Sequence, residues 1–364
     1  MPPRVPFLVV AVVAALVAAL VVSAPATADP ADPGPADGTT STTSTHTSTT
    51  PISTTPTSTG AARPRVKALV ATPLDASVVE NGTRWDLSNS CGTDNGLPTG
   101  GASDGSPGFA ILDATSPAAG DAFDCGGMVW VGSSVVADDD GTVDISPSGA
   151  DTVVTPSTVT IAGLQVRETY RVFASGDTVR ILVELQNPTA AAISTTVSYV
   201  DNFGSDVDTR VVGSSSGDTT FTTADRWIVD SDGPVSGDKL VNTTVLSGPG
   251  AAVTPNSVSE TVFSAGGTEG AIATFPVTVP PGATRAFMFF QVVGGGGNGT
   301  PNSALVASAA VWDSPIPASS PLLAGISPDV LGEIVNWSLA PAAAIAAPSA
   351  APAAAVGVVP TFAG

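Results

Sequence analysis

The strand that decides the fold class reads V-R-I-L-V-E-L and covers Val179–Leu185. Its first, third, fifth and seventh side chains are apolar, whereas Arg180 and Glu184 point to the opposite side, which is the two-residue period of a β-strand. Pro188 ends this strand, because proline cannot donate to a ladder of hydrogen bonds. The next segment, Ile193–Val200, also alternates. We therefore expect the two segments to form a hairpin with one buried and one solvent-exposed face.

Short segments of the same kind recur along the chain. A turn is expected at 280–283, where Gly282 accepts the positive φ of a type II turn. Glu and Lys, which commonly occupy helix surfaces, are scarce, whereas Gly (38) and Pro (32) are abundant. We predict an all-β fold, an antiparallel β-sandwich built as one large sandwich or two smaller ones. The further predicted strands are 67–72, 108–112, 128–136, 158–173, 209–212, 226–229, 239–246, 257–263, 271–279 and 285–293.

Two short helices are expected near the C-terminal end of the folded region. Ser327 is a good N-cap, Pro328 fits the first helical position, and the carboxylate of Asp329 lies near the positive end of the helix dipole. Apolar residues then recur at three- and four-residue spacing as far as Val335. The Ala-rich segment 302–312 is the other candidate helix.

Residues 1–28 have the features of a secretory signal peptide in the expected order. Arg4 supplies a positive charge, Phe7–Val22 is apolar without interruption, and Ala26 and Ala28 form a small-residue cleavage site. The alternative is an uncleaved membrane anchor, but the apolar run is short for a span. We expect cleavage after Ala28, no transmembrane segment in the mature chain, and a secreted, extracellular protein, at most loosely associated with a cell envelope.

Composition divides the rest of the chain. Residues 29–65 are rich in Ser, Thr and Pro and have too little apolar area to form a core, so they are predicted to be a disordered stalk that could carry O-linked sugars. Residues 339–364 are predicted to be a disordered Ala- and Pro-rich tail. Between them we expect an N-terminal β-sandwich part with a disulfide at 66–156, and the main β-sandwich with its closing helices at 157–338.

The chain has two cysteines, Cys91 and Cys125. In an exported protein an even pair is typical of a disulfide. The bridge would close a Gly- and Ser-rich loop and stabilise the fold by about 3–4 kcal/mol in the chain-entropy model. The alternative is a thiol nucleophile or a metal-binding pair, which here lacks both a supporting histidine and the C-x-x-C spacing.

Composition argues against several classes of function. A net charge of −20 disfavours nucleic acid as a partner, because the protein repels phosphate. The single histidine, His46, lies in the predicted stalk, so the folded region has no imidazole base for a serine hydrolase and no histidine ligand for zinc. A Ser–Lys site would need one of the two lysines, Lys67 or Lys239. We therefore predict no catalytic residues and a protein that is not an enzyme.

Acidic clusters at 138–144, 201–208 and 230–238 could bind Ca²⁺, which prefers several carboxylate and carbonyl oxygens in a flexible loop. The best candidate ligands are Asp201, Asp206 and Asp208. They follow a strong strand, and Gly204 would let backbone carbonyl groups approach an ion. The alternative is that these acidic residues only form hairpin turns and keep the protein soluble. No other cofactor is predicted.

Two stretches have turn chemistry of a recognisable kind. In 183–190, V-E-L-Q-N-P-T-A, a strand ends in Asn-Pro before the alternating strand 193–200, and 276–284 reads P-V-T-V-P-P-G-A-T. Both resemble the hairpins of bacterial surface proteins with immunoglobulin-like β-sandwich modules, of the cell-adhesion-related class. A third stretch, 215–227, resembles uncharacterised exported bacterial proteins. The resemblance implies an immunoglobulin-like sandwich and an extracellular binding or structural role, and it carries over no catalytic residue.

Two hypotheses on function follow. The main one is a secreted, non-enzymatic β-sandwich protein that acts as a cell-envelope or extracellular binding or structural module, through loops held on a rigid sheet. Its partner would be an envelope polysaccharide or an extracellular protein. The alternative is a carbohydrate-binding module or a glycoside hydrolase that uses two carboxylates. A groove holding two carboxylates beside an exposed tryptophan would favour the hydrolase.

Overall fold

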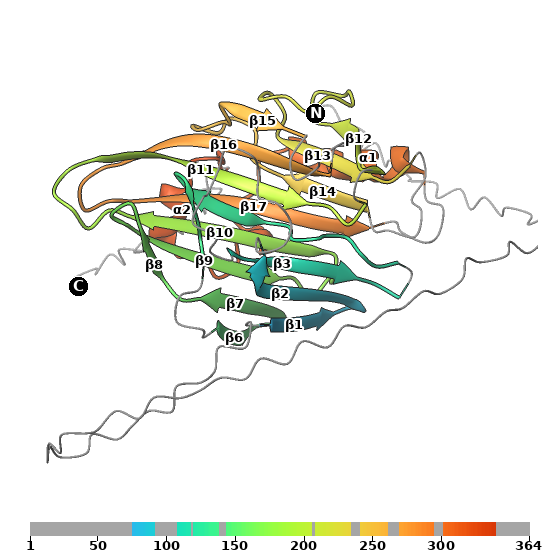
Figure 1. Ribbon diagram of the computed structural model, residues 1–364, viewed down its shortest axis with the longest axis horizontal. Coiled ribbons are helices and arrows are strands. Elements are labelled where there is room, and N and C mark those ends of the chain that lie inside the picture. Colours follow the sequence, from blue (N-terminus) through green and yellow to red (C-terminus); the bar gives the residue numbers. More distant parts are fainter. Residues whose placement is uncertain are drawn as a thin grey trace, which may run out of the picture. The chain divides into compact units, whose positions relative to one another are not determined.

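The computed structural model describes residues 75–91, 108–117, 119–137, 143–205, 208–233, 241–260, 269–294 and 301–339 (Figure 1). All of them belong to one compact unit, Lys67–Gly364. The predicted signal peptide and stalk, the strand predicted at 67–72 and nearly all of the predicted tail lie outside the described residues.

The described part of the chain is built from three β-sheets, and all strand pairings within them are antiparallel. A nine-stranded sheet has the order β12-β13-β14-β17-β10-β9-β7-β6, with β8 beside β9. A five-stranded sheet has the order β15-β16-β11-β4-β5, and a three-stranded sheet the order β1-β2-β3. These sheets confirm the predicted all-β antiparallel fold and support a sandwich-like arrangement.

The strands have the following bounds. The nine-stranded sheet contains β6 (Val143–Ser148), β7 (Asp151–Pro156), β8 (Val159–Ile161), β9 (Leu164–Val172), β10 (Thr178–Gln186), β12 (Arg210–Ser214), β13 (Trp227–Ser231), β14 (Val241–Val245) and β17 (Thr284–Gly294). The five-stranded sheet contains β4 (Met128–Val131), β5 (Ser134–Val135), β11 (Ile193–Asn202), β15 (Ser257–Ser259) and β16 (Gly270–Val279). The three-stranded sheet contains β1 (Asp75–Glu80), β2 (Thr83–Cys91) and β3 (Gly108–Thr115).

One apolar core joins the three sheets. Phe275 of β16 packs edge-on against Phe287 of β17, with ring centroids 5.6 Å apart. Trp85 of β2 is fully buried in the same cluster and lies 6.4 Å from Phe123, measured between ring centroids. Each fully buried large side chain contributes roughly 1.5–3 kcal/mol of hydrophobic free energy. The inner side of the large sheet is therefore held by both smaller sheets.

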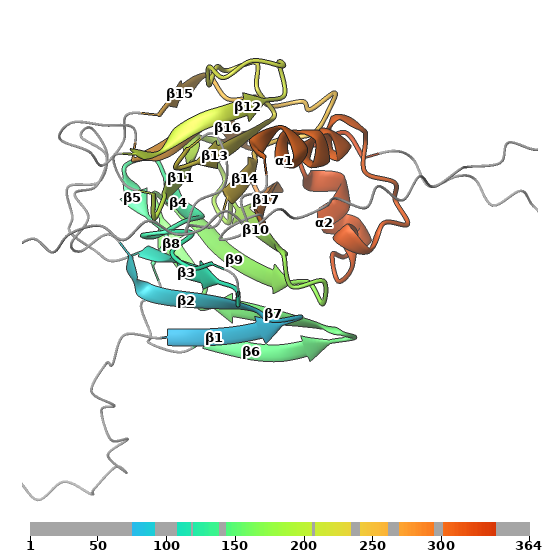
Figure 2. The same ribbon diagram turned by 90° about the vertical axis from the view of Figure 1, so that its right-hand side faces the viewer.

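Helical segments cover part of the outer face of the nine-stranded sheet, and Figure 2 shows α1 and α2 together on one side of the strands. Trp312 and Trp337 pack against Phe290 of β17, with centroid separations of 4.7 and 5.6 Å. The Ser327 side chain caps α2 by accepting a hydrogen bond from Val330 N. The segments are α1 (Asn302–Ala309), the 3-10 helices η2 (Ala310–Asp313) and η3 (Pro321–Leu323), and α2 (Pro328–Glu333).

Both helices expected from the sequence are present. Among the described residues, no helix is long and apolar enough to cross a membrane.

The two predicted hairpins are wrong, although their strands are present. β10 pairs with β9 and β17, whereas β11 pairs with β16 and β4, so the 187–192 connection crosses from one sheet to another. The Asn187 side-chain amide fixes this corner by donating to Ala191 O at 2.7 Å and Val279 O at 2.9 Å. The 280–283 turn likewise joins β16 of the five-stranded sheet to β17 of the nine-stranded one. Most of the outer face of β10 is also buried, because the C-terminal segment covers it, and Arg180 is 2% exposed.

Strand pairing crosses the expected border at residue 156 in both large sheets. β7 pairs with β9, and β4 pairs with β11. The parts 66–156 and 157–338 stay predictions.

Candidate functional site

A groove of about 480 Å³ lies on the outer face of β6, β7, β9 and β10, beside the C-terminal helical segment. We call it the polar groove. The segment Gly325–Val330 forms one wall, and a Cβ atom added at Gly325 would lie only 2.7 Å from Nη1 of Arg171. The residues that line it are Asp144, Ser146, Pro147, Ser148, Val153, Thr155, Arg167, Thr169, Arg171, Arg180, Leu182, Glu184, Gly325, Ile326, Ser327 and Val330.

The strands β6, β7, β9 and β10 form the floor of the groove, and their register arranges the side chains of this floor in rows. One row carries Arg171 opposite Arg180, with Val153 of β7 opposite Arg171. A second row, at the other end of β9, carries Arg167 opposite Glu184. The two arginines of β9 are four positions apart in the strand, which corresponds to about 13 Å. The floor therefore has chemically different ends.

The first row places two guanidinium groups side by side, and we call Arg171 and Arg180 the arginine pair. Arg171 Nε donates to Asp151 Oδ2 at 2.8 Å, and its Nη2 lies 2.6 Å from the same oxygen. Arg180 Nη1 donates to Leu322 O at 2.7 Å and to Ala324 O at 3.0 Å. Burial, together with the charge of Arg171, lowers the pKa of Arg180 to about 10, so the Arg180 guanidinium stays charged at neutral pH.

The second row is an exposed ion pair. Arg167 Nη1 lies 3.5 Å from Glu184 Oε1, and the two side chains are 51% and 19% exposed. Such a pair contributes at most about 1 kcal/mol to stability, because water and salt screen it. Both side chains are therefore free to exchange partners with a ligand in the groove.

A second polar site lies inside the sandwich. The carboxylate of Asp201 on β11 accepts hydrogen bonds from Gly127 N at 2.6 Å, Thr244 Oγ1 at 2.8 Å and Gln291 Nε2 at 2.8 Å. Asp201 is fully buried, and desolvation raises its pKa to about 6 against the opposing effect of these hydrogen bonds. We call these four residues the Asp201 cluster. Its position in the core fits a role in joining the sheets.

The calcium prediction named Asp201, Asp206 and Asp208. Asp201 belongs to the buried cluster just described, Asp208 is exposed, and Asp206 lies outside the described residues. Among the described residues, no group of three or more His, Cys, Asp or Glu side chains is arranged to hold a metal ion. The three ligands stay a prediction.

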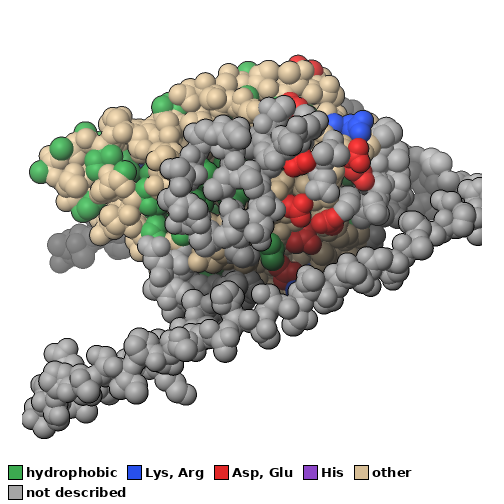
Figure 3. All heavy atoms as spheres, in the orientation of Figure 1, with side chains coloured by type: hydrophobic (Ala, Val, Ile, Leu, Met, Phe, Trp, Pro, Cys, Tyr) green, Lys and Arg blue, Asp and Glu red, His purple; other side chains and the backbone are tan. Residues whose placement is uncertain are grey.

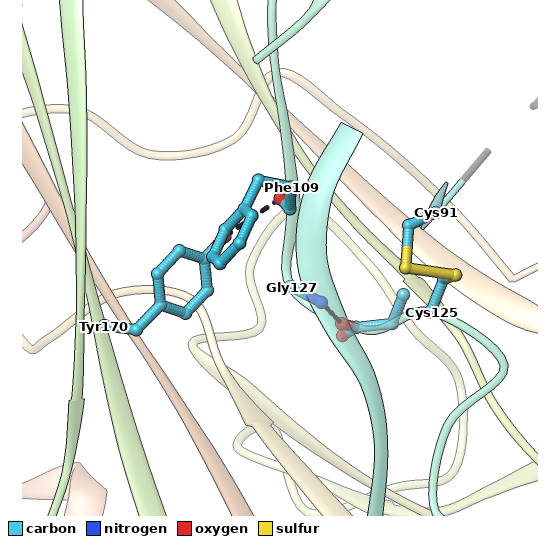
Figure 4. Close-up of a disulfide and its surroundings, with 6 residues drawn as sticks. Cys91, Phe109, Cys125, Gly127 and Tyr170 are labelled. Carbon is cyan, nitrogen blue, oxygen red and sulfur yellow. Dashed lines mark hydrogen bonds between the residues drawn. A yellow bond between two sulfur atoms is a disulfide. The ribbon is translucent and has the colours of Figure 1, made fainter. Parts of the chain in front are cut away.

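The disulfide between Cys91 and Cys125 is present, with 5.5 Å between its Cα atoms (Figure 4). It ties the end of β2 to the segment before β4, and both cysteines are buried. In the same view the hydroxyl of Tyr170 donates to Phe109 O at 3.1 Å, which links β9 of the large sheet to β3. The bridge is therefore a structural element beside the core.

All five tryptophans are buried: Trp85, Trp130, Trp227, Trp312 and Trp337 are between 0% and 7% exposed. None supplies an exposed platform on which a sugar ring could stack. Recognition in the polar groove must therefore depend on hydrogen bonds and charge.

The sequence predicted that Arg180 and Glu184 lie on a solvent-exposed face of β10. Arg180 is instead buried, whereas Glu184 is partly exposed. No role was predicted for Arg171. The signal that could have found the groove is that Arg171 and Arg180 lie on consecutive strands that pair across the short turn 173–177.

Comparisons with known proteins give matches in structure alone. No family model and no curated protein matches the chain. A putative aldose 1-epimerase from Klebsiella pneumoniae is 10% identical, with a TM-score of 0.37 over 65% of this chain and 82% of that one. A galactose mutarotase-like protein from Lactobacillus casei is 8% identical, with a TM-score of 0.36 over 60% of this chain and 100% of that one. A heparan sulfate lyase from Pedobacter heparinus is 8% identical, with a TM-score of 0.38 over 62% of this chain and 36% of that one.

These findings correct two predictions. The resemblance to immunoglobulin-like adhesion proteins is wrong: the similar structures include a putative aldose 1-epimerase and galactose mutarotase-like proteins. Both stretches that suggested the resemblance are corners between sheets. Several of these structures carry the names of enzymes, so the prediction of a protein that is not an enzyme does not stand; no activity comes to this chain from them. At these identities no substrate is transferred from them.

Proposed function

We propose that this protein binds a carbohydrate in the polar groove. The observation that carries the proposal is the chemistry of its floor, where charged and hydroxyl side chains of four neighbouring strands line one groove beside the C-terminal segment. Sugars present many hydroxyl groups, and arginine, carboxylate and hydroxyl side chains together supply the donors and acceptors that pair with them. The volume of about 480 Å³ lies within the usual range for small-molecule sites.

The rigidity of the floor supports this proposal. Arg171 is held by Asp151 and by the hydroxyl of Ser148, and Arg180 is held by two backbone carbonyl groups. Side chains that are already ordered lose little conformational entropy when a ligand binds. A groove without stacking aromatic rings depends on such fixed polar groups for its affinity.

A second candidate function is hydrolysis of a glycosidic bond. Asp144 and Glu184 both line the groove, so two carboxylates are available for the acid and base or nucleophile roles that glycosidases need. The test is the release of reducing sugar from a bound saccharide. Loss of turnover in both Glu184→Gln and Asp144→Asn, with binding retained, would support hydrolysis. Binding without turnover in the native protein would leave a binding module.

We also propose that the protein acts outside the cytoplasm. The signal-peptide pattern of residues 1–28 and the Cys91–Cys125 disulfide both support export, because disulfides persist in oxidising compartments. The partner would then be an envelope or extracellular polysaccharide. Detection of the processed protein in the culture medium, with its N-terminus determined, tests this part.

Binding is tested with the secreted protein on an array of saccharides, followed by calorimetry on each hit. Thr169→Trp fills the centre of the groove and should abolish binding. The matched control is Thr278→Trp, which places the same side chain at an exposed position of β16 in the other large sheet. The proposal fails if no saccharide binds, or if the two variants bind alike.

A further inference from the structure

We infer that the polar groove selects an acidic sugar, whose anionic group binds the arginine pair, Arg171 and Arg180. This inference rests on the proposed carbohydrate binding and names the class of ligand. The chain has 12 basic residues against 32 acidic ones, and the face in Figure 3 shows far more red than blue side chains. Three arginines nevertheless line this one groove.

The charges around the arginine pair do not balance. Two guanidinium groups lie opposite one another on neighbouring strands, an arrangement that is destabilising without a counter-ion. Asp151 is the carboxylate bound to Arg171 and the acidic group that acts on Arg180. The other acidic residues of the groove, Asp144 and Glu184, lie in other rows of the floor. One positive charge at this end is therefore left for a ligand.

Hydrogen bonding at the pair is also incomplete. Arg180 is 2% exposed, and its buried Nε has no hydrogen-bond partner in the structure. A buried donor without a partner costs about 1–3 kcal/mol, and more when it is charged. The guanidinium plane matches carboxylate and sulfate oxygens, which accept two hydrogen bonds at once. An anionic group seated beside the pair would offset the excess positive charge.

The opposite end of the floor favours the rest of a sugar. Glu184 at that end is an acceptor for hydroxyl groups, and so is Asp144, which lies opposite Thr155 between the ends. These carboxylates would repel a second anionic group. The ligand that fits is therefore a saccharide with its anionic group at the Arg171 end and neutral hydroxyl groups at the Glu184 end.

The decisive variant adds a charge and keeps both arginines. Val153 lies opposite Arg171 in the register and lines the groove, so Val153→Asp supplies a competing carboxylate, while Val153→Asn is the neutral control of nearly the same shape. The probes are oligogalacturonate, the same oligomer with its carboxylates methyl-esterified, and a sulfated galactan oligomer. Affinities are measured by calorimetry on the secreted protein.

The expected result is that an acidic probe binds at least roughly tenfold more tightly than the ester, a difference of about 1.4 kcal/mol. Val153→Asp should remove that preference, and Val153→Asn should keep it. Preference for the uronate or for the sulfated probe identifies which anionic group is used. Equal binding of acid and ester, or equal effects of the two variants, overturns this inference and leaves carbohydrate binding in place. Failure of every saccharide on the array and of all three probes overturns both.

Discussion

The side-chain amide of Gln291 on β17 donates to both carboxylate oxygens of Asp201 on β11, at 2.8 Å to each. These strands belong to different sheets, so a single amide and carboxyl connect the two large sheets through their interior. Gln291 also donates to the hydroxyl of Tyr199 at 2.9 Å. The core is therefore held by a polar network as well as by packed aromatic rings. The free energy of unfolding must therefore depend on whether the carboxyl group of Asp201 is charged.

The first prediction concerns the pH dependence of stability. Burial raises the pKa of Asp201 from 3.8 to about 6, so the native state binds a proton more tightly than the unfolded chain. The free energy of unfolding should therefore fall as the pH rises from about 4 to about 6, and stay lower above that. Two pKa units correspond to roughly 3 kcal/mol. Burial also raises the pKa of Glu168 and Asp230, which adds to the fall.

Urea unfolding between pH 4.5 and 7.5 measures this effect. Asp201→Asn should weaken the dependence of the free energy of unfolding on pH. Asp218→Asn, at an exposed turn, should leave that dependence unchanged. A profile of Asp201→Asn as steep as that of the native protein would contradict the assignment to Asp201.

The second prediction concerns the disulfide. Removing the bridge in Cys91→Ala/Cys125→Ala should lower the free energy of unfolding by about 4 kcal/mol, because the unfolded chain regains the entropy of a loop with a sequence separation of 34. Reduction of the native protein is the matched control, since it breaks the bond without changing side-chain volume. A non-reducing mass measurement gives the state of the thiols. Equal unfolding midpoints for the oxidised and reduced protein would show that the bridge adds no stability.

The sequence predicted strands better than their partners. The alternation in 179–185 and 193–200 located β10 and β11, since period-two patterning is a local property. Partner choice depends on long-range contacts, and a Pro- or Asn-containing connection looks the same whether it turns within a sheet or crosses between sheets. The hairpin β1–β2 was missed although Asn81-Gly82, with φ of 45° and 86°, is a strong hairpin signal.

The groove was not predicted for the same reason, because it depends on strand register and on long-range contacts. Arg171 and Arg180 meet because of a register, and the wall at Gly325–Val330 comes from a segment more than 140 residues later in the chain. The acidic composition of the chain predicted functional sites in acidic loops. The local excess of arginine on one face appears only after the strands are paired.

The third prediction is the calcium site that the sequence suggested at Asp201, Asp206 and Asp208. A bound ion specific to the native state must stabilise it, so the midpoint of thermal unfolding should rise with added Ca²⁺ and fall with chelator. Asp208→Asn should abolish that difference, while Asp218→Asn should keep it. An unchanged midpoint of thermal unfolding in excess chelator would contradict the prediction of a bound Ca²⁺ ion.

The fourth prediction compares two glycines with nearly the same backbone. Gly176 has φ of 84° and Gly217 has φ of 86°, so alanine is strained by about 1–2 kcal/mol at either position. A Cβ at Gly176 would lie 2.1 Å from Glu80 O, whereas a Cβ at Gly217 meets nothing within 4 Å. Gly176 O also accepts a hydrogen bond from Trp85 Nε1 at 2.9 Å. This turn therefore links the three-stranded sheet to the nine-stranded one. Gly176→Ala should therefore lower the free energy of unfolding by about 1–3 kcal/mol more than Gly217→Ala in urea unfolding, since overpacking adds a cost of that size. Equal losses would mean that the β1–β2 hairpin does not pack against this turn.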